Sequence, residues 1–307
     1  MTLRIKQAGA LSLIQDLGRL GYQDVGVTAG GPMDNHAFYW ANRLLDNPPN
    51  ASQIEITMGP FAAVFEQSTT FSLCGAEVVA KLNNQTISNW HSWVAKSDDV
   101  LTLSFPKTGL RTYLAVAGGF DVPKMLGSTS TVVRDHFGGI TQQGDKLRDG
   151  DALPYQPNVS SYCRGVLKQF IPDYAETIRI GVLPTYQFDQ FDKEAINTFF
   201  SQVYTVTPLI DRMGYRLEGA TINFPQQHFI SEGIVPGSIQ IPANGQPIVL
   251  MRDRQTIGGY PKIGCVCNRD LNLLAQATPG TKIQFFLQDL FEAEAELQQE
   301  QHYFYSV

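Results

Sequence analysis

Short runs in which apolar and polar residues alternate cover most of this 307-residue chain. Alternation with a period of two is typical of half-buried strands, and turn residues separate the runs. The runs predict strands at 3–5, 54–57, 62–65, 70–73, 77–82, 100–103, 113–116 and 178–183, with further strands up to residue 286. Many short strands with regular turns favour closed or sandwiched sheets, so the sequence predicts a mainly β protein.

A few segments have helical spacing instead. Asp34 can cap a helix whose apolar positions lie between 37 and 45 and which ends before Pro48. Asn42 lies among those apolar positions, which predicts a buried, hydrogen-bonded amide. Further helices are predicted over 193–202 and 289–301.

Residues 155–175 are rich in Pro, Ser and Asn and indicate a domain junction. We therefore predict an N-terminal β domain over 1–165 and a C-terminal β domain over 166–307. Segments 54–103 and 217–285 share similar motif spacings, which suggests a duplicated domain. The second segment is longer because it contains an additional polar stretch.

That polar stretch, residues 252–262, lies between two apolar segments, 247–251 and 263–267. We expect a hairpin in which Gly258-Gly259 adopts positive φ and brings backbone N–H groups close to a ligand. The stretch also contains two arginines and a lysine, and an arginine such as Arg254 supplies a planar donor fork for carboxylate or phosphate. The alternative is a solvated hairpin whose charges pair with one another.

The overall charge narrows the function classes. The formal net charge is −6 and charged residues make up 17% of the chain, which disfavours extensive binding to nucleic acid or to an anionic membrane. The first residues contain no apolar signal region, and no apolar run has membrane-spanning length. The dispersed cysteines, Cys74, Cys163, Cys265 and Cys267, are expected to be small buried residues in a reducing, cytoplasmic compartment.

Several common chemical motifs are missing from the sequence. The spacing Gly139 to Gly144 is that of a P-loop, but Asp145 occupies the position that requires Lys. No Gly-x-Ser-x-Gly elbow is present, and the histidines lack metal-ligand spacing, so no metal site is predicted. The chain also lacks a biotin-attachment signature, so any biotin would arrive on another chain.

Specific motifs occur along nearly the whole chain. They are QDLGR at 15–19, GPMD at 31–34, EITxGP at 55–60, LGSxST at 126–131, DRMGYRLEG at 211–219, SEG at 231–233, GSIQ at 237–240, GQP at 245–247 and DRQTxGGYPK at 253–262. With these motifs the chain resembles the allophanate hydrolase subunit 2 or KipA-like family, also called biotin-dependent carboxyltransferase-like, which includes the C subunit of 5-oxoprolinase. It departs from the family pattern at 142–146 and at 184–187, where the family usually reads Pro-Gly-Pro-Gln.

The resemblance implies two cyclophilin-like β-barrel domains and a role as the C subunit of a multi-subunit, ATP-dependent 5-oxoprolinase that converts 5-oxo-L-proline to L-glutamate. The implied partners are the B subunit, which is KipI-like, and the A subunit, which is LamB/YcsF-like, with ATP handled together with them. One alternative is a carboxyltransferase for urea or a related amide, with biotin on a partner. Another is a regulatory partner of a KipI-like kinase inhibitor.

The motif positions also define candidate site residues. Asp16, Asp34 and Glu232 are candidate general bases. Arg254 and Lys262 are candidates for stabilising negative charge during catalysis. The candidate substrate-binding residues are Arg19, Asn42, Arg212, Arg216, Gln240, Gln255, Thr256, Gly258, Gly259 and Tyr260.

Overall fold

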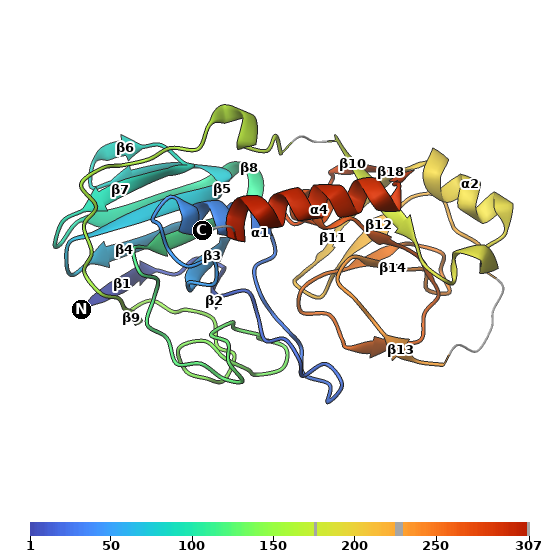
Figure 1. Ribbon diagram of the computed structural model, residues 1–307, viewed down its shortest axis with the longest axis horizontal. Coiled ribbons are helices and arrows are strands. Elements are labelled where there is room, and N and C mark those ends of the chain that lie inside the picture. The colour runs from blue at the N-terminus through green and yellow to red at the C-terminus, as the bar shows by residue number, and fades with distance from the viewer. Residues whose placement is uncertain (175–176, 225–229, 306–307) are drawn as a thin grey trace. The chain divides into compact units, whose positions relative to one another are not determined.

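The computed structural model describes residues 1–174, 177–224 and 230–305, which form two compact units (Figure 1). Unit 1 consists of Met1–Leu20 and Gly30–Asp173. Unit 2 consists of Gly21–Ala29 and the described residues from Tyr174 onward. Each unit is built mainly of strands, which confirms the prediction of a mainly β protein with two β domains and few helices.

Unit 1 contains a 9-stranded sheet in which the central path runs β2-β3-β8-β4-β1-β9 and β5 pairs with β6, β7 and β8. Its strands are β1 (Thr2–Gln7), β2 (Leu11–Gln15), β3 (Gln53–Thr57), β4 (Phe61–Phe65), β5 (Thr69–Leu82), β6 (Gln85–Ile87), β7 (His91–Ala95), β8 (Val100–Val116) and β9 (Ala152–Pro154). Its helices are α1 (Asn35–Arg43) and the short 3₁₀ turn η1 (Lys168–Phe170).

The long strands β5 and β8 correct the sequence prediction, which divided each of them into two shorter strands. They pair along most of their length, with register shifts between Gly75 and Ala80. Gly75 has φ +104°, and a Cβ at this position would lie 2.3 Å from the carbonyl oxygen of Arg111 on β8. A glycine that reads as a turn in the sequence is therefore a bend within one continuous strand.

Helix α1 begins where its capping residue predicts. The Asp34 carboxylate accepts a hydrogen bond from the backbone N–H of Ala37 at 3.0 Å, so it satisfies one of the free donors of the first turn. Asn42 is buried, and its amide nitrogen donates to the carbonyl oxygens of Pro49 and Ala51. The predicted buried amide is thus confirmed, and it ties the end of α1 to the segment that follows.

Unit 2 is a closed, seven-stranded barrel with the order β10-β17-β14-β15-β12-β11-β18, closed by the parallel pair β10 and β18. Its strands are β10 (Thr177–Pro184), β11 (Val203–Ile210), β12 (Gly214–Glu218), β14 (Ser238–Gln240), β15 (Ile248–Leu250), β17 (Lys262–Val266) and β18 (Lys282–Leu287). A separate two-stranded ladder joins β13 (Glu232–Gly233) to β16 (Ile257–Gly258). The helices are η2 (Phe188–Gln190), α2 (Lys193–Ser201), α3 (Asn268–Leu274) and α4 (Leu290–Tyr305).

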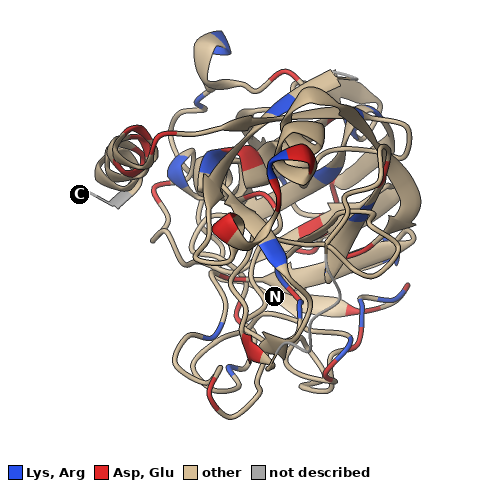
Figure 2. Ribbon diagram, turned by 90° about the vertical axis from the view of Figure 1, so that its right-hand side faces the viewer, with Lys and Arg blue, Asp and Glu red and all other residues tan. Residues whose placement is uncertain are grey.

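Alternation explains how the barrel of unit 2 fills its interior. Ile178 and Ile180 of β10 are buried, as are Ile283 and Phe285 of β18, whereas the residues between them, Arg179 and Gln284, are exposed. Phe285 stacks on Phe199 of α2 with ring centroids 4.5 Å apart. The predicted helices over 193–202 and 289–301 are confirmed as α2 and α4, and Figure 2 shows acidic residues, coloured red on the ribbon, in α4 near the C-terminus.

The predicted hairpin around residues 252–262 is wrong. The two flanking strands, β15 and β17, do not pair with each other, because β14 lies between them and pairs with both. The register between β14 and β17 shifts next to the pair Gln240 and Lys262, which marks a bulge. Bulges redirect side chains and are common beside functional sites.

The remaining observations concern the cysteines and the hydropathy of the helices. The cysteines are all free, and Cys74 and Cys267 are buried as expected, but Cys265 is only half-buried and Cys163 is exposed, so the expectation of buried cysteines is wrong for Cys163 and holds only in part for Cys265. In the described part of the chain, no helix combines the length and hydropathy needed to cross a membrane.

Candidate functional site

Asp16 of unit 1 lies in a dense set of hydrogen-bond donors. Its carboxylate accepts from the hydroxyls of Ser128 and Ser130 at 2.5 and 2.7 Å, and from the backbone N–H groups of Gly18 and Thr129 at 2.9 and 2.8 Å. Burial raises the pKa of Asp16, but these hydrogen bonds outweigh it and hold the pKa below the ordinary value. A carboxylate that is stabilised in its charged form and saturated with donors fixes the turn at 15–19 and is a weak base.

The other predicted site residues of unit 1 also have structural contacts. Arg19 is buried, donates to the carbonyl oxygens of Ser130 and Met125, and lies over the ring of Phe137. Asp34 caps α1 and Asn42 holds its end, as described above. The geometry therefore favours structural roles for all of these residues.

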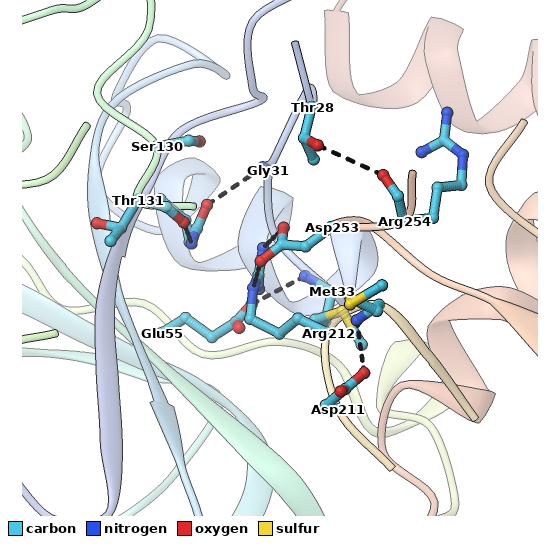
Figure 3. A network of polar contacts seen from close by, with 12 residues as sticks. Thr28, Gly31, Met33, Glu55, Ser130, Thr131, Asp211, Arg212, Asp253 and Arg254 are labelled. Carbon is cyan, nitrogen blue, oxygen red and sulfur yellow. Dashed lines mark hydrogen bonds and ion pairs between the residues drawn. The ribbon is translucent and has the colours of Figure 1, made fainter. Parts of the chain in front are cut away.

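In unit 2, Arg212 is engaged by a carboxylate of the protein itself. Its Nε and Nη2 donate to the two oxygens of Asp253 at 2.8 and 2.9 Å, and both side chains are buried (Figure 3). The backbone N–H of Asp253 also donates to the carbonyl oxygen of Arg212 at 2.7 Å. This bidentate pair anchors the stretch that begins at Met251, so Arg212 positions the loop instead of reaching a ligand.

Arg254 is the contrasting case. It is only 4% exposed, and its Nε donates to the carbonyl oxygen of Ile234 at 3.0 Å. Among the described residues no carboxylate oxygen lies within 4.0 Å of its guanidinium. Burial, followed by repulsion from Arg252, lowers the pKa of Arg254 to about 10.

The direction of the Arg254 side chain is consistent with the absence of a carboxylate partner. Figure 3 shows its guanidinium pointing away from the Arg212–Asp253 pair, and its carbonyl oxygen accepts from the Thr28 hydroxyl at 3.4 Å. With a pKa of about 10 the group is still a cation at neutral pH. A buried cation without a carboxylate partner is suited to receive an anionic ligand.

Lys262 and Glu232 form the second charged feature of unit 2. Lys262 is nearly buried and pairs with Oε1 of Glu232, whose side chain is 30% exposed. The same Oε1 accepts from the amide of Gln187 at 2.9 Å. The Oε1 of Gln187 in turn accepts from the backbone N–H of Lys262 at 2.7 Å, so one glutamine links both members of the pair.

Two amides approach Gly258, which lies opposite Glu232 in the β13–β16 ladder. A Cβ at Gly258 would lie 2.6 Å from Cδ1 of Ile234, 3.1 Å from Nε2 of Gln240 and 3.5 Å from Nε2 of Gln255. Nε2 of Gln240 is buried and has no hydrogen-bond partner among the described residues. Because an unsatisfied buried N–H costs free energy, this donor is a further candidate contact for a ligand oxygen.

The remaining predicted residues are less closely connected. Arg216 projects from the exposed face of β12, and Thr256 contributes a carbonyl oxygen to Ile234 N–H. Gly258 and Gly259 are not among the residues with positive φ, so the predicted left-handed backbone is wrong. Gly258 is required instead because a side chain would collide with its neighbours. Tyr260 is 51% exposed, and its carbonyl oxygen accepts from Lys262 Nζ at 3.3 Å.

Gln187 is the residue that the sequence analysis did not select. It lies in the segment 184–187, which the sequence marks only as a departure from the family pattern. Cys265 interacts electrostatically with Arg254 but is interpreted from the sequence only as a small buried residue, and burial raises the pKa of its thiol to about 11. Contacts that join segments so distant in sequence leave no periodic signal.

The described residues contain no cluster of His, Cys, Asp and Glu that could hold a metal ion. Within the same described residues, the fold and site define a two-unit β protein whose barrel carries a buried guanidinium without a carboxylate neighbour, an acid–lysine pair and an unsatisfied amide. Guanidinium groups bind anions, and free amide N–H groups bind carbonyl oxygens.

Comparisons with known proteins identify the family of this chain. Residues 25–287 match the family described as "Carboxyltransferase domain, subdomain A and B", and the chain belongs to that family. It is 39% identical to the C subunit of 5-oxoprolinase from Escherichia coli over 98% of this chain and 96% of that protein, and 35% identical to the C subunit of 5-oxoprolinase from Haemophilus influenzae over 91% and 89%. The crystal structure of Kluyveromyces lactis urea carboxylase superimposes with a TM-score of 0.91 at 28% identity, covering 98% of this chain and 29% of that one.

Proposed function

We propose that this chain is the C subunit of a multi-subunit, ATP-dependent 5-oxoprolinase, which hydrolyses 5-oxo-L-proline to L-glutamate. Its similarity over nearly full length to two proteins that carry this name supports the assignment. The structural observation that supports this assignment is the environment of Arg254, which is a buried cation without a carboxylate neighbour among the described residues. 5-Oxoproline carries one carboxylate and one ring amide, which are the two groups that these residues suit.

The contacts of these side chains support the following chemistry. Arg254 binds the substrate carboxylate, and Nε2 of Gln240 donates to an oxygen of the ligand. Glu232 accepts a proton from the attacking water through its second oxygen, and the nearby Lys262 stabilises the negative charge that develops. In this proposal the γ-phosphoryl group of ATP transfers to the ring carbonyl oxygen and ADP leaves. A first water then adds to the activated carbon, and the ring C–N bond breaks as the nitrogen takes up a proton. A second water hydrolyses the resulting acyl phosphate to glutamate and phosphate.

A lactam amide is stable, so ATP must supply the driving force for opening the ring. We propose that ATP is handled together with two partner proteins, the KipI-like B subunit of the enzyme and its LamB/YcsF-like A subunit. This chain supplies no P-loop, and the single guanidinium of Arg254 suits one small anion. It follows that the isolated chain does not turn over.

The test is reconstitution. The chain is mixed with its proposed partners, 5-oxoproline and ATP, and glutamate and ADP are quantified while each protein is omitted in turn. Product should form only in the complete mixture and should fall to background when this chain is left out. Unchanged glutamate production without this chain would overturn the proposal.

A second function is favoured by the superposition on urea carboxylase. In that case the chain is a carboxyltransferase that acts on urea or a related amide, and a partner brings carboxybiotin to it. Arg254 and Lys262 would then stabilise a carboxylate-like transition state. Biotin-dependent carboxylation of urea in a mixture that leaves 5-oxoproline intact would establish this alternative in place of the first.

A further inference from the structure

We propose that Gln187 is a positioning residue that holds Glu232 and Lys262 in their working arrangement. This inference rests on the proposed function, in which that pair handles the proton and the charge. One amide group contacts both members of the pair, through its oxygen to Lys262 and through its nitrogen to Glu232. Gln187 itself is 3% exposed, so its rotamer is confined by packing.

Hydrogen-bond chemistry fixes the orientation of the Gln187 amide. A backbone N–H can only donate, so the group that faces Lys262 N at 2.7 Å must be the amide oxygen. The amide nitrogen therefore faces Glu232 at 2.9 Å and donates to its carboxylate. A rotated amide would place two donors against each other and would lose both bonds.

The arrangement also distinguishes the two oxygens of Glu232. Oε1 receives both Gln187 and Lys262, whereas Oε2 receives no donor from the described residues. Because Glu232 is 30% exposed, Oε2 remains available to accept a proton or a hydrogen bond from a ligand or water. Gln187 thereby occupies one oxygen and leaves the other free in a fixed direction.

A neighbouring residue provides a matched control. The Thr185 hydroxyl donates to the carbonyl oxygen of Lys262 at 2.8 Å, so Thr185 and Gln187 hold the two sides of the same backbone residue. Only Gln187 contacts Glu232 as well. Thr185→Val consequently removes a comparable backbone contact and leaves the link to Glu232 in place.

The experiment compares Gln187→Met, Gln187→Glu and Thr185→Val in the reconstituted assembly. Methionine has a similar length but cannot donate to Glu232, and glutamate keeps the acceptor for Lys262 while placing a second negative charge beside Glu232. We expect kcat to fall about tenfold to a hundredfold in both Gln187 variants, with the KM for ATP unchanged. Thr185→Val should retain kcat within about twofold.

A second measurement does not depend on turnover. The isolated chain and its variants are treated with acetic anhydride, and the acetylation of Lys262 is quantified by mass spectrometry relative to the exposed Lys107. Lys262 has 5% side-chain exposure, so it should react slowly in the wild-type chain and in Thr185→Val, and several-fold faster in Gln187→Met. Equal Lys262 acetylation in wild-type and Gln187→Met would overturn the positioning role.

The two measurements separate the two proposals. Faster acetylation in Gln187→Met, combined with a complete assembly that does not open 5-oxoproline, removes the proposed function and keeps the positioning role. An active assembly in which Gln187→Met has normal kcat removes the positioning role and keeps the proposed function. A loss of kcat in Thr185→Val equal to that in Gln187→Met would assign both residues to general support of the backbone and would also refute the inference.

Discussion

Replacing Arg254 by methionine should abolish activity while leaving stability nearly unchanged. Burial lowers the pKa of Arg254 from 12.5 to about 10, so keeping the group charged in the folded chain costs about 3 kcal/mol. The pKa is lower in the folded state, so this cost is fully present below pH 10 and disappears as the pH rises towards 12.5. At neutral pH the charge of Arg254 therefore destabilises the folded state.

Methionine removes this cost and also removes the charged hydrogen bond to Ile234, which contributes about 1.5–3 kcal/mol. The two effects nearly cancel, so the free energy of unfolding should change by about 1.5 kcal/mol or less. The melting temperature should then shift by no more than about 6 °C. Glutamate release by the reconstituted assembly should fall to background, because the proposed contact to the substrate carboxylate is lost.

Arg212→Met is the matched control, because Arg212 is equally buried but paired with Asp253. Removing one member of a buried pair leaves the other charge without compensation and typically costs about 3–5 kcal/mol. Its melting temperature should fall by about 6–20 °C. Both variants can be followed by thermal unfolding and by glutamate release. If Arg254→Met loses as much stability as Arg212→Met, the interpretation of Arg254 as a ligand-binding cation is refuted.

Three other predictions, two of them with a matched control variant, test separate parts of the structure. Asp16→Asn should cost about 1.5–3 kcal/mol of stability. Because the pKa of Asp16 is lowered in the folded state, its contribution to stability is present above pH 3.8 and is lost as the pH falls through the folded pKa. Identical acid unfolding of wild type and variant would contradict this. Gly258→Ala should reduce activity at a stability cost of about 1–3 kcal/mol. At Gly264 a Cβ would lie 2.2 Å from a valine methyl inside the barrel, so Gly264→Ala should mainly lower the melting temperature. A larger loss of activity in Gly264→Ala than in Gly258→Ala would count against the proposed site. Cys265→Asp should supply Arg254 with a carboxylate, and so raise thermal stability and block activity. Cys265→Asn should do neither. An active Cys265→Asp variant would show that Arg254 binds no anion.

Much of the fold could be predicted because its signals are local. The cap at Asp34 depends on a bond to Ala37, three residues away, and the alternation in β10 and β18 depends on side chains two residues apart. What the sequence could not show is which strands become neighbours. The segment β14 enters between β15 and β17, and this order separates two strands that look like a hairpin in the sequence.

The candidate site was predictable as a set of residue types but not as a set of partners. Arg212 and Arg254 look alike in the sequence, and only the fold assigns the single carboxylate of Asp253 to Arg212. Gln187 and Lys262 are 75 positions apart, and no periodicity connects them. Motif reasoning therefore selects charged residues for both structural and functional reasons without separating the two.

The structure separates structural charges from candidate functional charges by whether the protein itself supplies a partner for each buried group. Buried ions are expected to be paired. Asp16, Arg212 and Asp253 satisfy that expectation through donors and acceptors of the protein itself. Arg254 and the amide nitrogen of Gln240 do not, since the first lacks a carboxylate and the second lacks any acceptor among the described residues. In the proposed function a ligand compensates for these two costs, so Arg254 and Gln240, and not all charged motif residues, mark the proposed substrate-binding region.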